Sequence, residues 1–536
     1  MALITAGAGP QPAAAQESTP RSEAGPSSGR LPEPRSHVSP VPGGVAGLGL
    51  SFETSRLFGA TGGSTFIPPD TMGAVGPNHI VEMINGNYQS FNKFTGASLE
   101  DMTLDAFWTN KVGLPIVAAN GGRFDPRVVY DTASQRWFAV SIDRAVDADN
   151  NNVNEQSNNL FVGRSDTNDP TGDWDGFMID ADTVGAEEFH DYPTLGIDAD
   201  GVYSCTQDFD GGGNETCYSF PKADLLLAAP TAANLTRFEA TPAGLPAING
   251  SWQPAIDFGA SDGRAAVLGS TGTALRRTSI LGAGGAGATL AADVAIAGDP
   301  GHAAPPAARQ PTDDVGESNT IENVAPRFVG NVFELGNSLW AVHSVLGSTP
   351  TNAALRWYEI NETTNTVIQT GLIDDPNRDF HEPTIAVNNN GDVVIGYTCS
   401  GPALAASVCV SLGTTAAGVT TFQAPAVVVT GTGDYYRDFC TPTMANPCAE
   451  RNRWGDYSAT VIDPVNPCKF WSFQEYNAVA ATGDVGPGEN ESGNWGIRAV
   501  ELTFQQCQAD AGLRDFGDLP DTYGTVLASN GARHIE

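Results

Sequence analysis

The chain of 536 residues carries 62 acidic and 27 basic side chains, so its formal net charge is −35. A surface of this sign repels phosphate backbones and anionic membranes, which excludes nucleic acid as a favoured partner. It suits cations such as Ca²⁺, or simply a well-solvated exterior. The 61 glycines, the 36 prolines and the absence of a long helical pattern indicate short strands and turns. No apolar run is long enough to cross a bilayer.

Residues 1–46 are rich in Pro, Ser, Ala and Gly and predict a disordered leader. The opening stretch MALITAGAGPQPAAAQESTP resembles the end of a secretory signal with an A-x-A-like site, but it lacks a basic n-region. Two interpretations therefore stand side by side: a truncated signal segment and a plain leader. The folded domain is expected to span residues 47–510.

A faint repeat organises this domain. Its unit is an acidic residue, a proline one or two positions later, alternating apolar residues, and Asp or Asn five positions after the proline. The clearest copies are DPRVVYD, DYPTLGID and EPTIAVN, whereas APRFVGN, DYSATVID, QPAIDFG and PDTMGAVG keep parts of the unit. Their proline positions align at residues 71, 126, 193, 254, 326, 383 and 458.

Each copy continues with further short apolar runs, such as RWFAVSID and DVVIGYT. Four short strands in a unit of about 60 residues, repeated about seven times, are typical of a β-propeller, in which each blade buries its faces against its neighbours. The sequence therefore predicts an all-β propeller of seven four-stranded blades, with six as the alternative because the copies are degenerate. NWGIRAVELTF from Asn494 is expected to pair with GLSFETSRLF from Gly49 and to close the ring.

Eight cysteines predict four local disulfides. The expected pairs are Cys205–Cys217, Cys399–Cys409, Cys440–Cys448 and Cys468–Cys507. Disulfides indicate an oxidising compartment, so we expect a secreted or cell-surface protein. None of the cysteines falls in a CxxC motif, which argues against zinc. The pairing is a hypothesis, since eight cysteines allow about 105 pairings.

Residues 511–536 do not fit the repeat and are interpreted as the start of a truncated downstream module or a linker. Three motifs of the chain, PPDTMGAVGPNHIVEMIN, DPRVVYDTASQRWF and RWGDYSATVIDP, resemble those of a broad group of secreted bacterial propeller proteins. The members of that group are mostly uncharacterised and often belong to large cell-surface polypeptides. The tail from Asp515 is similar to segments that introduce modules in multidomain bacterial surface proteins. The resemblance implies an extracellular setting and no settled activity.

In a propeller the first strand of each blade lines the central channel, so residues at its start converge near one mouth. This places seven candidates for a ligand site there: Asp125, Arg127, His190, Asp191, His381, Glu382 and Asp456. Clustered carboxylates raise one another's pKa or hold a cation. The alternative, which the repetition favours, is that each acid caps backbone N–H groups where its strand begins. We assign no catalytic residue.

A secreted glycan hydrolase is the alternative function. A glycosidase needs two carboxylates facing a sugar pocket, whereas a sialidase-like enzyme would use Tyr192 or Tyr457 as nucleophile and arginines to clamp a carboxylate. Arg127 is suitably placed, but we find neither companion arginines at matching positions nor S-x-D-x-G-x-T-W boxes. The one G-x-S-x-G match, around Ser261, precedes a predicted strand and favours a hairpin turn over a nucleophile elbow.

The best local metal candidate is the stretch DADNNNVNEQSNN. Its oxygen-bearing side chains alternate as in calcium loops, although Asn152 replaces the usual glycine. The proposed ligands are Asp147, Asp149, Asn151 and Glu155. A solvated loop is the alternative interpretation, and DFDGGGNE from Asp208 is a weaker second candidate.

Together these patterns predict a binding or adhesion module of a larger bacterial surface protein, monomeric itself, with Ca²⁺ as its one expected cofactor. Its partner would be an extracellular glycan or protein, held by loops on a rigid ring. A purely structural spacer is the third alternative. Trp174 and Trp252 have the ring size to stack on sugars, but packing within the blades is the favoured interpretation.

Overall fold

The computed structural model describes residues 4–5, 46–60, 62–116, 122–144, 158–181, 189–208, 215–239, 252–311, 320–324, 326–437, 452–478, 493–505, 507, 514–515 and 534–535. Strands dominate these residues. The helical segments of the described chain are short: α1 (Leu104–Ala106), the π-helical turn η1 (Phe107–Lys111) and α2 (Lys222–Leu225). None of the helices in this part of the chain has the length or the apolar character of a transmembrane span.

Two four-stranded antiparallel sheets come first along the chain. One consists of β5 (Met72–Val75), β6 (His79–Ile84), β7 (Asn87–Asn92) and β8 (Ser98–Thr103). The other consists of β9 (Phe124–Asp131), β10 (Arg136–Ile142), β11 (Asn159–Ser165) and β12 (Trp174–Asp180). In both sheets, strands that are consecutive in sequence lie next to each other, which is the order of a propeller blade.

A 14-stranded sheet contains three further groups of this kind. The first is β14 (Gly196–Ile197), β15 (Gly201–Asp208), β16 (Glu215–Pro221) and β17 (Thr236–Glu239), with β13 (His190–Asp191) also paired to β15. The second is β18 (Gln253–Asp257), β19 (Arg264–Ser270) and β20 (Leu275–Leu281), edged by β21 (Thr289–Leu290) and β22 (Val294–Ala295). The third is β25 (Val332–Leu335), β26 (Ser338–Leu346), β27 (Ala353–Asn361) and β28 (Thr366–Ile373). Parallel pairings of β18 with β14 and with β25 join the groups through their first strands.

Two five-stranded sheets complete the fold. One is β29 (Asp379–Val387), β30 (Asp392–Gly401), β31 (Leu404–Ala416) and β32 (Val419–Phe422), with β33 (Ala426–Val429) on β31. The other is β34 (Ala459–Ile462), β35 (Lys469–Ala478), β36 (Asn494–Phe504), β2 (Ala46–Leu57) and β3 (Gly63–Ser64). Because β2 pairs with β36 in antiparallel register, the first long strand of the chain completes the last sheet. The predicted ring closure is confirmed.

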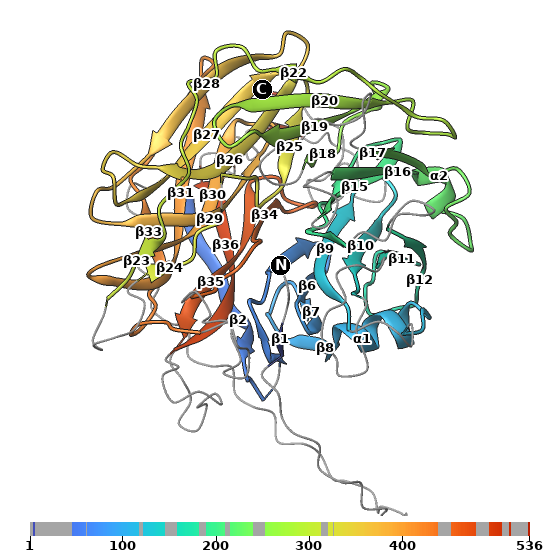
Figure 1. Ribbon diagram of the computed structural model, residues 1–536, viewed down its shortest axis with the longest axis horizontal. Coiled ribbons are helices and arrows are strands. Elements are labelled where there is room, and N and C mark those ends of the chain that lie inside the picture. Colours follow the sequence, from blue (N-terminus) through green and yellow to red (C-terminus); the bar gives the residue numbers. More distant parts are fainter. Residues whose placement is uncertain are drawn as a thin grey trace, which may run out of the picture.

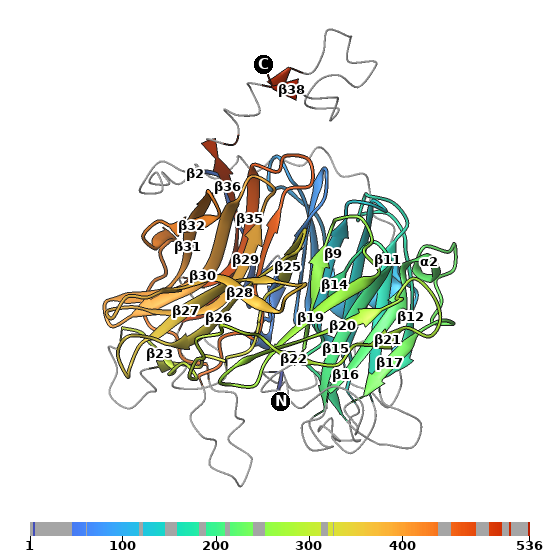
Figure 2. The ribbon, with the colours of Figure 1, turned by 90° about the horizontal axis from the view of Figure 1, so that it is seen from above.

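The strand groups follow one another in chain order around a central axis (Figure 1), and Figure 2 views the same ring edge-on. First strands of neighbouring groups contact each other, and the contact of β34 with β5 joins the end of the ring to its beginning. The predicted all-β propeller is confirmed. The pairings fall into seven groups, but three of them share one continuous sheet, so the number of blades stays a prediction.

Three pairs of short strands lie outside these groups. They are β1 (Ile4–Thr5) with β4 (Phe66–Ile67), β23 (Ala308–Arg309) with β24 (Thr320–Ile321), and β37 (Arg514–Asp515) with β38 (His534–Ile535).

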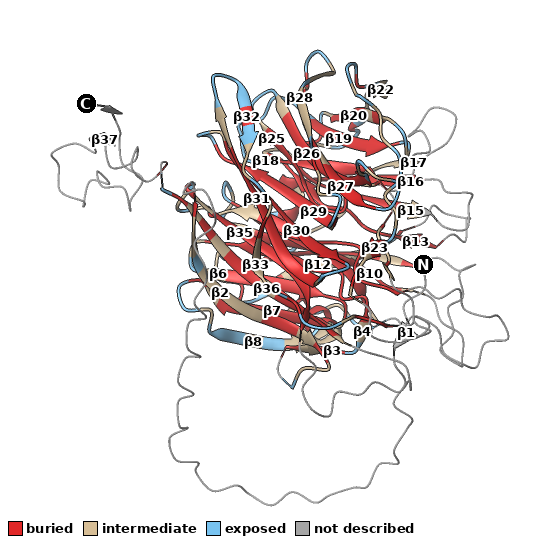
Figure 3. Cartoon of the chain, turned by 90° about the vertical axis from the view of Figure 1, so that its left-hand side faces the viewer, coloured by how far each residue is buried: buried red, intermediate tan, exposed pale blue. Residues whose placement is uncertain are grey.

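Burial falls from the axis to the rim of each blade. Every residue of the inner strands β9 and β29 is buried, whereas the outer strand β8 alternates between exposed and half-buried positions (Figure 3). The inner strands are covered on both sides because neighbouring blades pack against them, which explains their nearly unbroken apolar runs. The core is therefore a ring of side chains between blades, with the polar inner-strand residues as its exceptions.

Three disulfides join the pairs expected from the sequence: Cys205–Cys217, Cys399–Cys409 and Cys468–Cys507. The first two link neighbouring strands of one blade, β15 to β16 and β30 to β31. Cys440 and Cys448, the fourth expected pair, lie outside the described residues.

Candidate functional site

Acidic residues that precede or begin the inner strands gather at one end of the axis of the ring, in a buried cluster that we call the mouth. Five different strand groups supply its carboxylates: Asp70, Asp125, Asp191, Glu382 and Asp456. Burial, followed by the charges of Asp191, Asp70 and Asp456, raises the pKa of Asp125 well above its usual range. Residues up to 386 positions apart in the sequence are therefore close neighbours here. This is the convergence expected of these acids.

The backbone at the mouth is strained in a repeated way. Asp70, Asp125, Tyr192 and Glu382 have φ of 51°, 50°, 57° and 49°, in the left-handed region that non-glycine residues rarely adopt. All four occupy the position directly before the aligned repeat position. Such a conformation costs of order 1–3 kcal/mol and persists only where surrounding contacts hold it, which is common in ligand sites.

A chain of hydrogen bonds connects the acids across the axis. Asn85 Nδ2 donates to Asp70 Oδ2 at 2.6 Å, and Asn85 Oδ1 accepts the Asp125 N–H at 2.7 Å. The other oxygen of Asp70 accepts the Asp456 N–H at 2.8 Å, and Tyr457 Oη donates to Asp125 Oδ2 at 2.7 Å. Part of the acidic cluster thus satisfies backbone N–H groups, as the structural interpretation of these acids expects.

Arg453 favours the ionised form of Asp456. Its guanidinium binds both carboxylate oxygens, at 3.0 and 2.6 Å, and lies 3.2 Å from Glu322 Oε2. Burial alone would raise the pKa of Asp456, but Arg453 outweighs burial and lowers it below the usual range. Burial and then the charge of Asp456 raise the pKa of Asp70 to about 8. Two neighbouring carboxyl groups therefore have pKa values that are shifted in opposite directions.

Two further arginines stack on the tyrosines of the mouth. The Arg127 guanidinium lies 3.6 Å from the centre of the Tyr457 ring, and that of Arg327 lies 4.5 Å from the centre of the Tyr192 ring. Arg127 Nε donates to the Pro193 carbonyl at 2.9 Å. Arg127 is fully buried, which favours its contact with Tyr457 because cation–π attraction strengthens on desolvation.

Arg327 corrects one sequence expectation. It follows Pro326 just as Arg127 follows Pro126, so a companion arginine at the matching repeat position does exist. Arg453 joins the cluster from outside the repeat position, three residues before its partner Asp456. The signal for Arg327 was present in APRFVGN and was overlooked because that copy lacks the acidic residue.

Glu382 is an acid of the mouth whose carboxyl group lacks hydrogen-bond partners among the described residues. It is 2% exposed, and neither of its carboxyl oxygens has a hydrogen-bond partner of normal geometry among the described residues. Burial and then the charge of Asp456 raise its pKa well above the usual range, and the opposing effects of the Val324 amide, Arg453 and Arg327 do not outweigh them. A carboxyl group in this environment favours its protonated form.

Glu475 on β35 is a second buried acid of the mouth, and sequence reasoning missed it. Its Oε1 accepts a hydrogen bond from Thr71 Oγ1 at 3.0 Å, while Oε2 has no partner in the described part of the chain. Burial raises its pKa well above the usual range, and Glu382 and Asp456 add to the rise. Because Glu475 lies on the second strand of its blade, no repeat position marked it.

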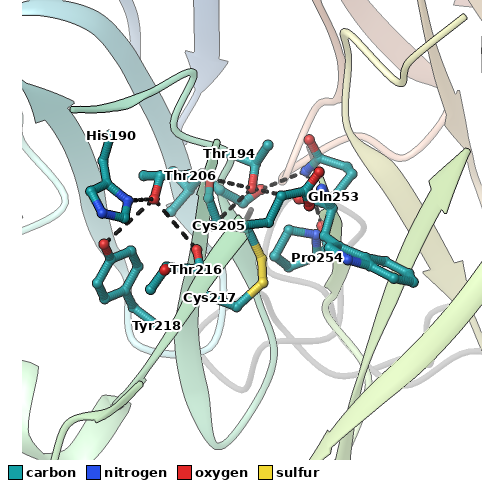
Figure 4. The surroundings of a disulfide bond; sticks show 12 residues. His190, Thr194, Cys205, Thr206, Thr216, Cys217, Tyr218, Gln253 and Pro254 are labelled. Atoms are coloured by element: carbon teal, nitrogen blue, oxygen red, sulfur yellow. Dashed lines mark hydrogen bonds between the residues drawn. A yellow bond between two sulfur atoms is a disulfide. The ribbon is translucent and has the colours of Figure 1, made fainter. Parts of the chain in front are cut away.

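The two histidines of the sequence candidates contact side chains other than the acids of the mouth. His190 Nδ1 lies 3.0 Å from Thr206 Oγ1, within the blade that holds the Cys205–Cys217 disulfide (Figure 4). His381 contacts the Trp454 ring, with 6.2 Å between ring centres, and burial lowers its pKa to about 3. Among the described contacts, His381 does not bond to Glu382, the carboxyl group that follows it in sequence.

The predicted calcium loop, with Asp147, Asp149, Asn151 and Glu155, lies outside the described residues, as does most of DFDGGGNE. Elsewhere in the described chain, oxygens of Asp262, Glu334 and Glu362 lie within 4.8 Å of one another. Arg277 is ion-paired with Glu362 and already supplies positive charge there. The mouth carboxylates do not form a group of three this tight among the described residues.

The remaining sequence candidates are structural. Ser261 lies in the exposed hairpin between β18 and β19, where its Oγ donates to Asp200 Oδ2 at 2.5 Å. Trp174 and Trp252 are buried in the core. The favoured interpretation of all three was therefore right.

The opposite end of the channel is apolar. Inner-strand residues including Val75, Val129, Ile256 and Phe333 surround a cavity of about 20 Å³ there. This volume has room for little more than one water molecule.

No protein-family model and no curated protein matches this chain. Among solved structures, it is similar to an exo-β-1,3-galactanase from Phanerochaete chrysosporium (11% identity, 85% of this chain and 99% of that chain, TM-score 0.29). It is also similar to Drosophila semaphorin 1b (6%, 86% and 90%, 0.37) and to a Hadza microbial sialidase (12%, 67% and 65%, 0.34). Similarities this weak carry no argument about function.

The strand pairings and the mouth together define the class of protein: a disulfide-linked β-propeller with buried acids and arginines at one end of its channel. The resemblance to secreted bacterial surface proteins remains a prediction from the three sequence motifs.

Proposed function

We propose that this propeller is an extracellular binding module whose mouth takes a glycan. The observation that carries the proposal is a set of buried polar atoms without hydrogen-bond partners among the described residues. They belong to both carboxyl oxygens of Glu382, the side-chain amide of Asn323, Arg127 Nη2 and Arg327 Nε. Native proteins satisfy most buried polar groups, so a cluster of unsatisfied ones calls for a ligand or ordered water.

A sugar suits this set because its hydroxyl groups both donate and accept hydrogen bonds. Arg127 and Arg327 offer donors, Asn323 offers a donor and an acceptor, and a protonated Glu382 offers both. Arg327 and Asn323 are half-buried, whereas Arg127 and Glu382 are fully buried. The two half-buried side chains therefore form the accessible edge of the site, and the two buried ones form its base.

An extracellular setting is part of the proposal. It is supported by three disulfides in the described chain, because such bonds persist in oxidising compartments. We further propose that the domain is a monomeric part of a larger surface polypeptide, on the strength of the sequence motifs. A protein ligand at the mouth and a spacer role are the competing outcomes of the test.

Glycan hydrolysis is the second candidate, and a specific observation favours it. Asp456 is held ionised by Arg453, while Glu382 favours its protonated form in the same cluster. Two carboxyl groups with pKa values shifted in opposite directions are what an acid/base pair needs. Tyr457, hydrogen-bonded to Asp125 and stacked on Arg127, is the matching nucleophile for a sialidase-like reaction.

The test is a glycan array probed with the full chain, with and without EDTA, followed by hydrolysis assays on every glycan that binds. The proposal expects specific binding without turnover. The variant Arg327→Ala should lose at least tenfold in affinity, since hydrogen bonds from a charged donor contribute about 1.5–3 kcal/mol. Its matched control is Arg378→Ala, which removes an exposed arginine from a surface ion pair.

Each outcome decides between the candidates. Turnover that is lost in Glu382→Gln, with folding intact, would replace the binding module by the hydrolase. Loss of binding in EDTA supports the proposed Ca²⁺ requirement, and unchanged binding argues against it. An array without any specific signal, or equal affinities for Arg327→Ala and Arg378→Ala, contradicts a glycan site at the mouth.

A further inference from the structure

A hollow of about 200 Å³ lies on the face opposite the mouth, between the first and the last blade of the ring. The residues that line it come from the turns after β5, β7 and β34 and from β35 and β36. Asp463 follows the end of β34, whereas Asp456 precedes its start, so the two sites lie at opposite ends of the same inner strand. We call this hollow the seam site, because β34 and β5 meet where the ring closes.

Two exposed apolar side chains flank the seam site. Phe94 is 68% exposed and Val465 is 55% exposed, and both line the hollow. Single exposed apolar residues are ordinary, but two that face one concave site are typical of a binding surface. The apolar lining continues with Pro77 and the buried Trp471.

The backbone that carries Phe94 is fixed by hydrogen bonds within its turn. Asn92 Oδ1 accepts hydrogen bonds from the backbone N–H groups of Phe94 at 3.0 Å and of Thr95 at 3.1 Å. The Gly96 N–H donates to the Asn92 carbonyl at 2.8 Å, and Gly96 has φ of 70°. An aromatic ring on a fixed turn loses little conformational entropy when a ligand covers it.

Some polar groups of the seam site are fully hydrogen-bonded within the protein, whereas others can still bond to a ligand. Asp463 is fully used: it binds Lys93 Nζ at 3.1 Å and accepts the N–H groups of Val465 and Asn466 and the indole N–H of Trp471. Lys469 and Glu501, which pair at 2.6 Å, are both partly exposed. Each retains capacity for further hydrogen bonds, because an ammonium has three donors and a carboxylate has two oxygens.

Charge selects the class of ligand. The two acids of the seam site are matched by two lysines, so the site has no excess charge with which to attract an ionic ligand. Its features are an exposed ring, a donor and an acceptor beside each other, and space for one six-membered ring. For scale, a cavity of about 150 Å³ lined by apolar side chains holds a benzene molecule.

We propose that the seam site binds a single neutral pyranose unit, with the apolar face of the sugar on Phe94 and its hydroxyl groups on Lys469 and Glu501. This site is independent of the mouth, so it stands whether or not the mouth binds a glycan. A chain with both sites would hold two sugar units on opposite faces of the ring, and their simultaneous use would raise the avidity for a branched or multivalent glycan.

The test is saturation-transfer difference NMR on the full chain with the methyl pyranosides of glucose, galactose and mannose. At least one should receive saturation on the protons of its apolar face. Phe94→Ala should weaken that binding roughly tenfold, given the usual contribution of an aromatic contact. Lys469→Met should weaken it as well, because it removes the ammonium donors. Phe94 is exposed, so its replacement is not expected to impair folding.

A matched control separates this site from other exposed rings. Phe258→Ala removes a half-exposed ring from another hairpin and should leave pyranoside binding unchanged. Phe94→Ala itself separates the seam site from the mouth, because a pyranoside held at the mouth would be unaffected by it. The proposal is overturned if none of the three pyranosides receives saturation. It is also overturned if Phe94→Ala binds like the wild type, or if Phe258→Ala abolishes the signal.

Discussion

Asp456 and Arg453 show how much the mouth depends on single side chains. Both are buried, and the two-point contact at 3.0 and 2.6 Å is the best-formed charge pair of the cluster. The positive charge of Arg453 compensates the negative charge of Asp456, whose acidic neighbours include Asp70, Glu382 and Glu475. The mouth is therefore a cluster in which a buried arginine compensates part of the negative charge of the acids.

Arg453→Ala should therefore be strongly destabilising. Removing one partner of a buried pair leaves the other charge uncompensated, which costs about 3–5 kcal/mol. The measurement is urea-induced unfolding at neutral pH. Arg378→Ala is the matched control, since its exposed pair with Asp375 at 3.6 Å contributes about 1 kcal/mol at most. Equal losses in the two variants would contradict the balance of charges described for the mouth.

Among the secondary-structure elements, β2 closes the ring, and Glu82 of β6 binds this strand to the first blade. This buried side chain of β6 accepts hydrogen bonds from Thr54 and Ser55 of β2, so it ties the last blade to the first. Burial raises its pKa to about 7, despite the two hydroxyl donors that favour the ionised form.

The pH dependence of stability follows from the raised pKa values of Glu82 and of Asp70, about 7 and about 8. Unfolded carboxyl groups titrate near pH 4, so in this range the folded state binds protons more tightly. The resulting stability is complete below about pH 4 and is lost as the pH rises through 7 and 8. The urea midpoint should thus be higher at pH 5 than at pH 9.

Glu82→Gln isolates one part of this dependence. The amide cannot ionise, so the variant should show a smaller change in urea midpoint between pH 5 and pH 8 than the wild type. A urea midpoint that rises toward pH 9 in the wild type would argue against a protonated Glu82 at the closing strand. So would a variant whose urea midpoint changes with pH as much as that of the wild type.

Gly73 tests the close approach of neighbouring blades. A Cβ at this position of β5 would lie 2.3 Å from the Phe473 ring on β35. Gly73→Ala should cost about 1–3 kcal/mol, the usual range for overpacking a core. Gly285→Ala is the control, because a Cβ there meets no atom within 4 Å. The measurement compares the urea midpoints of the two variants. An unchanged midpoint for Gly73→Ala would show that the two blades can move apart at little cost in free energy.

The sequence predicted elements well and site details poorly, for physical reasons. Strand pattern and the three described disulfides depend on local periodicity and spacing, which a single sequence displays, whereas ring closure follows from the circular arrangement of the repeats. The roles of Glu475 and Arg453 depend on which side chains meet across the axis. Thr71, which donates to Glu475, lies in another blade, and Glu322, which Arg453 contacts besides the nearby Asp456, follows β24 outside the blades; both contacts join residues more than a hundred positions apart, so no spacing rule predicts them. Arg327 was predictable from Arg127 and was missed.

At the scale of the whole molecule, stability depends on the first long strand. A chain that starts at residue 58 lacks β2 and leaves β36 as an unpaired edge, which favours aggregation. We expect it to lose the cooperative thermal transition seen by circular dichroism and to elute as aggregates. A chain that starts at residue 46 keeps β2 and should unfold like the full chain. Similar behaviour of both truncations would refute closure by β2.

Binding of a glycan at the mouth can be measured by hydrogen–deuterium exchange on the full chain, with and without the strongest glycan from the array. Added protection is expected in the segments that precede or start the inner strands, 69–72, 124–128, 190–195, 380–384 and 453–458, and in 322–324 and 326–328, which hold Asn323 and Arg327. Protection confined to the outer strands, or no change at a saturating glycan concentration, would contradict it.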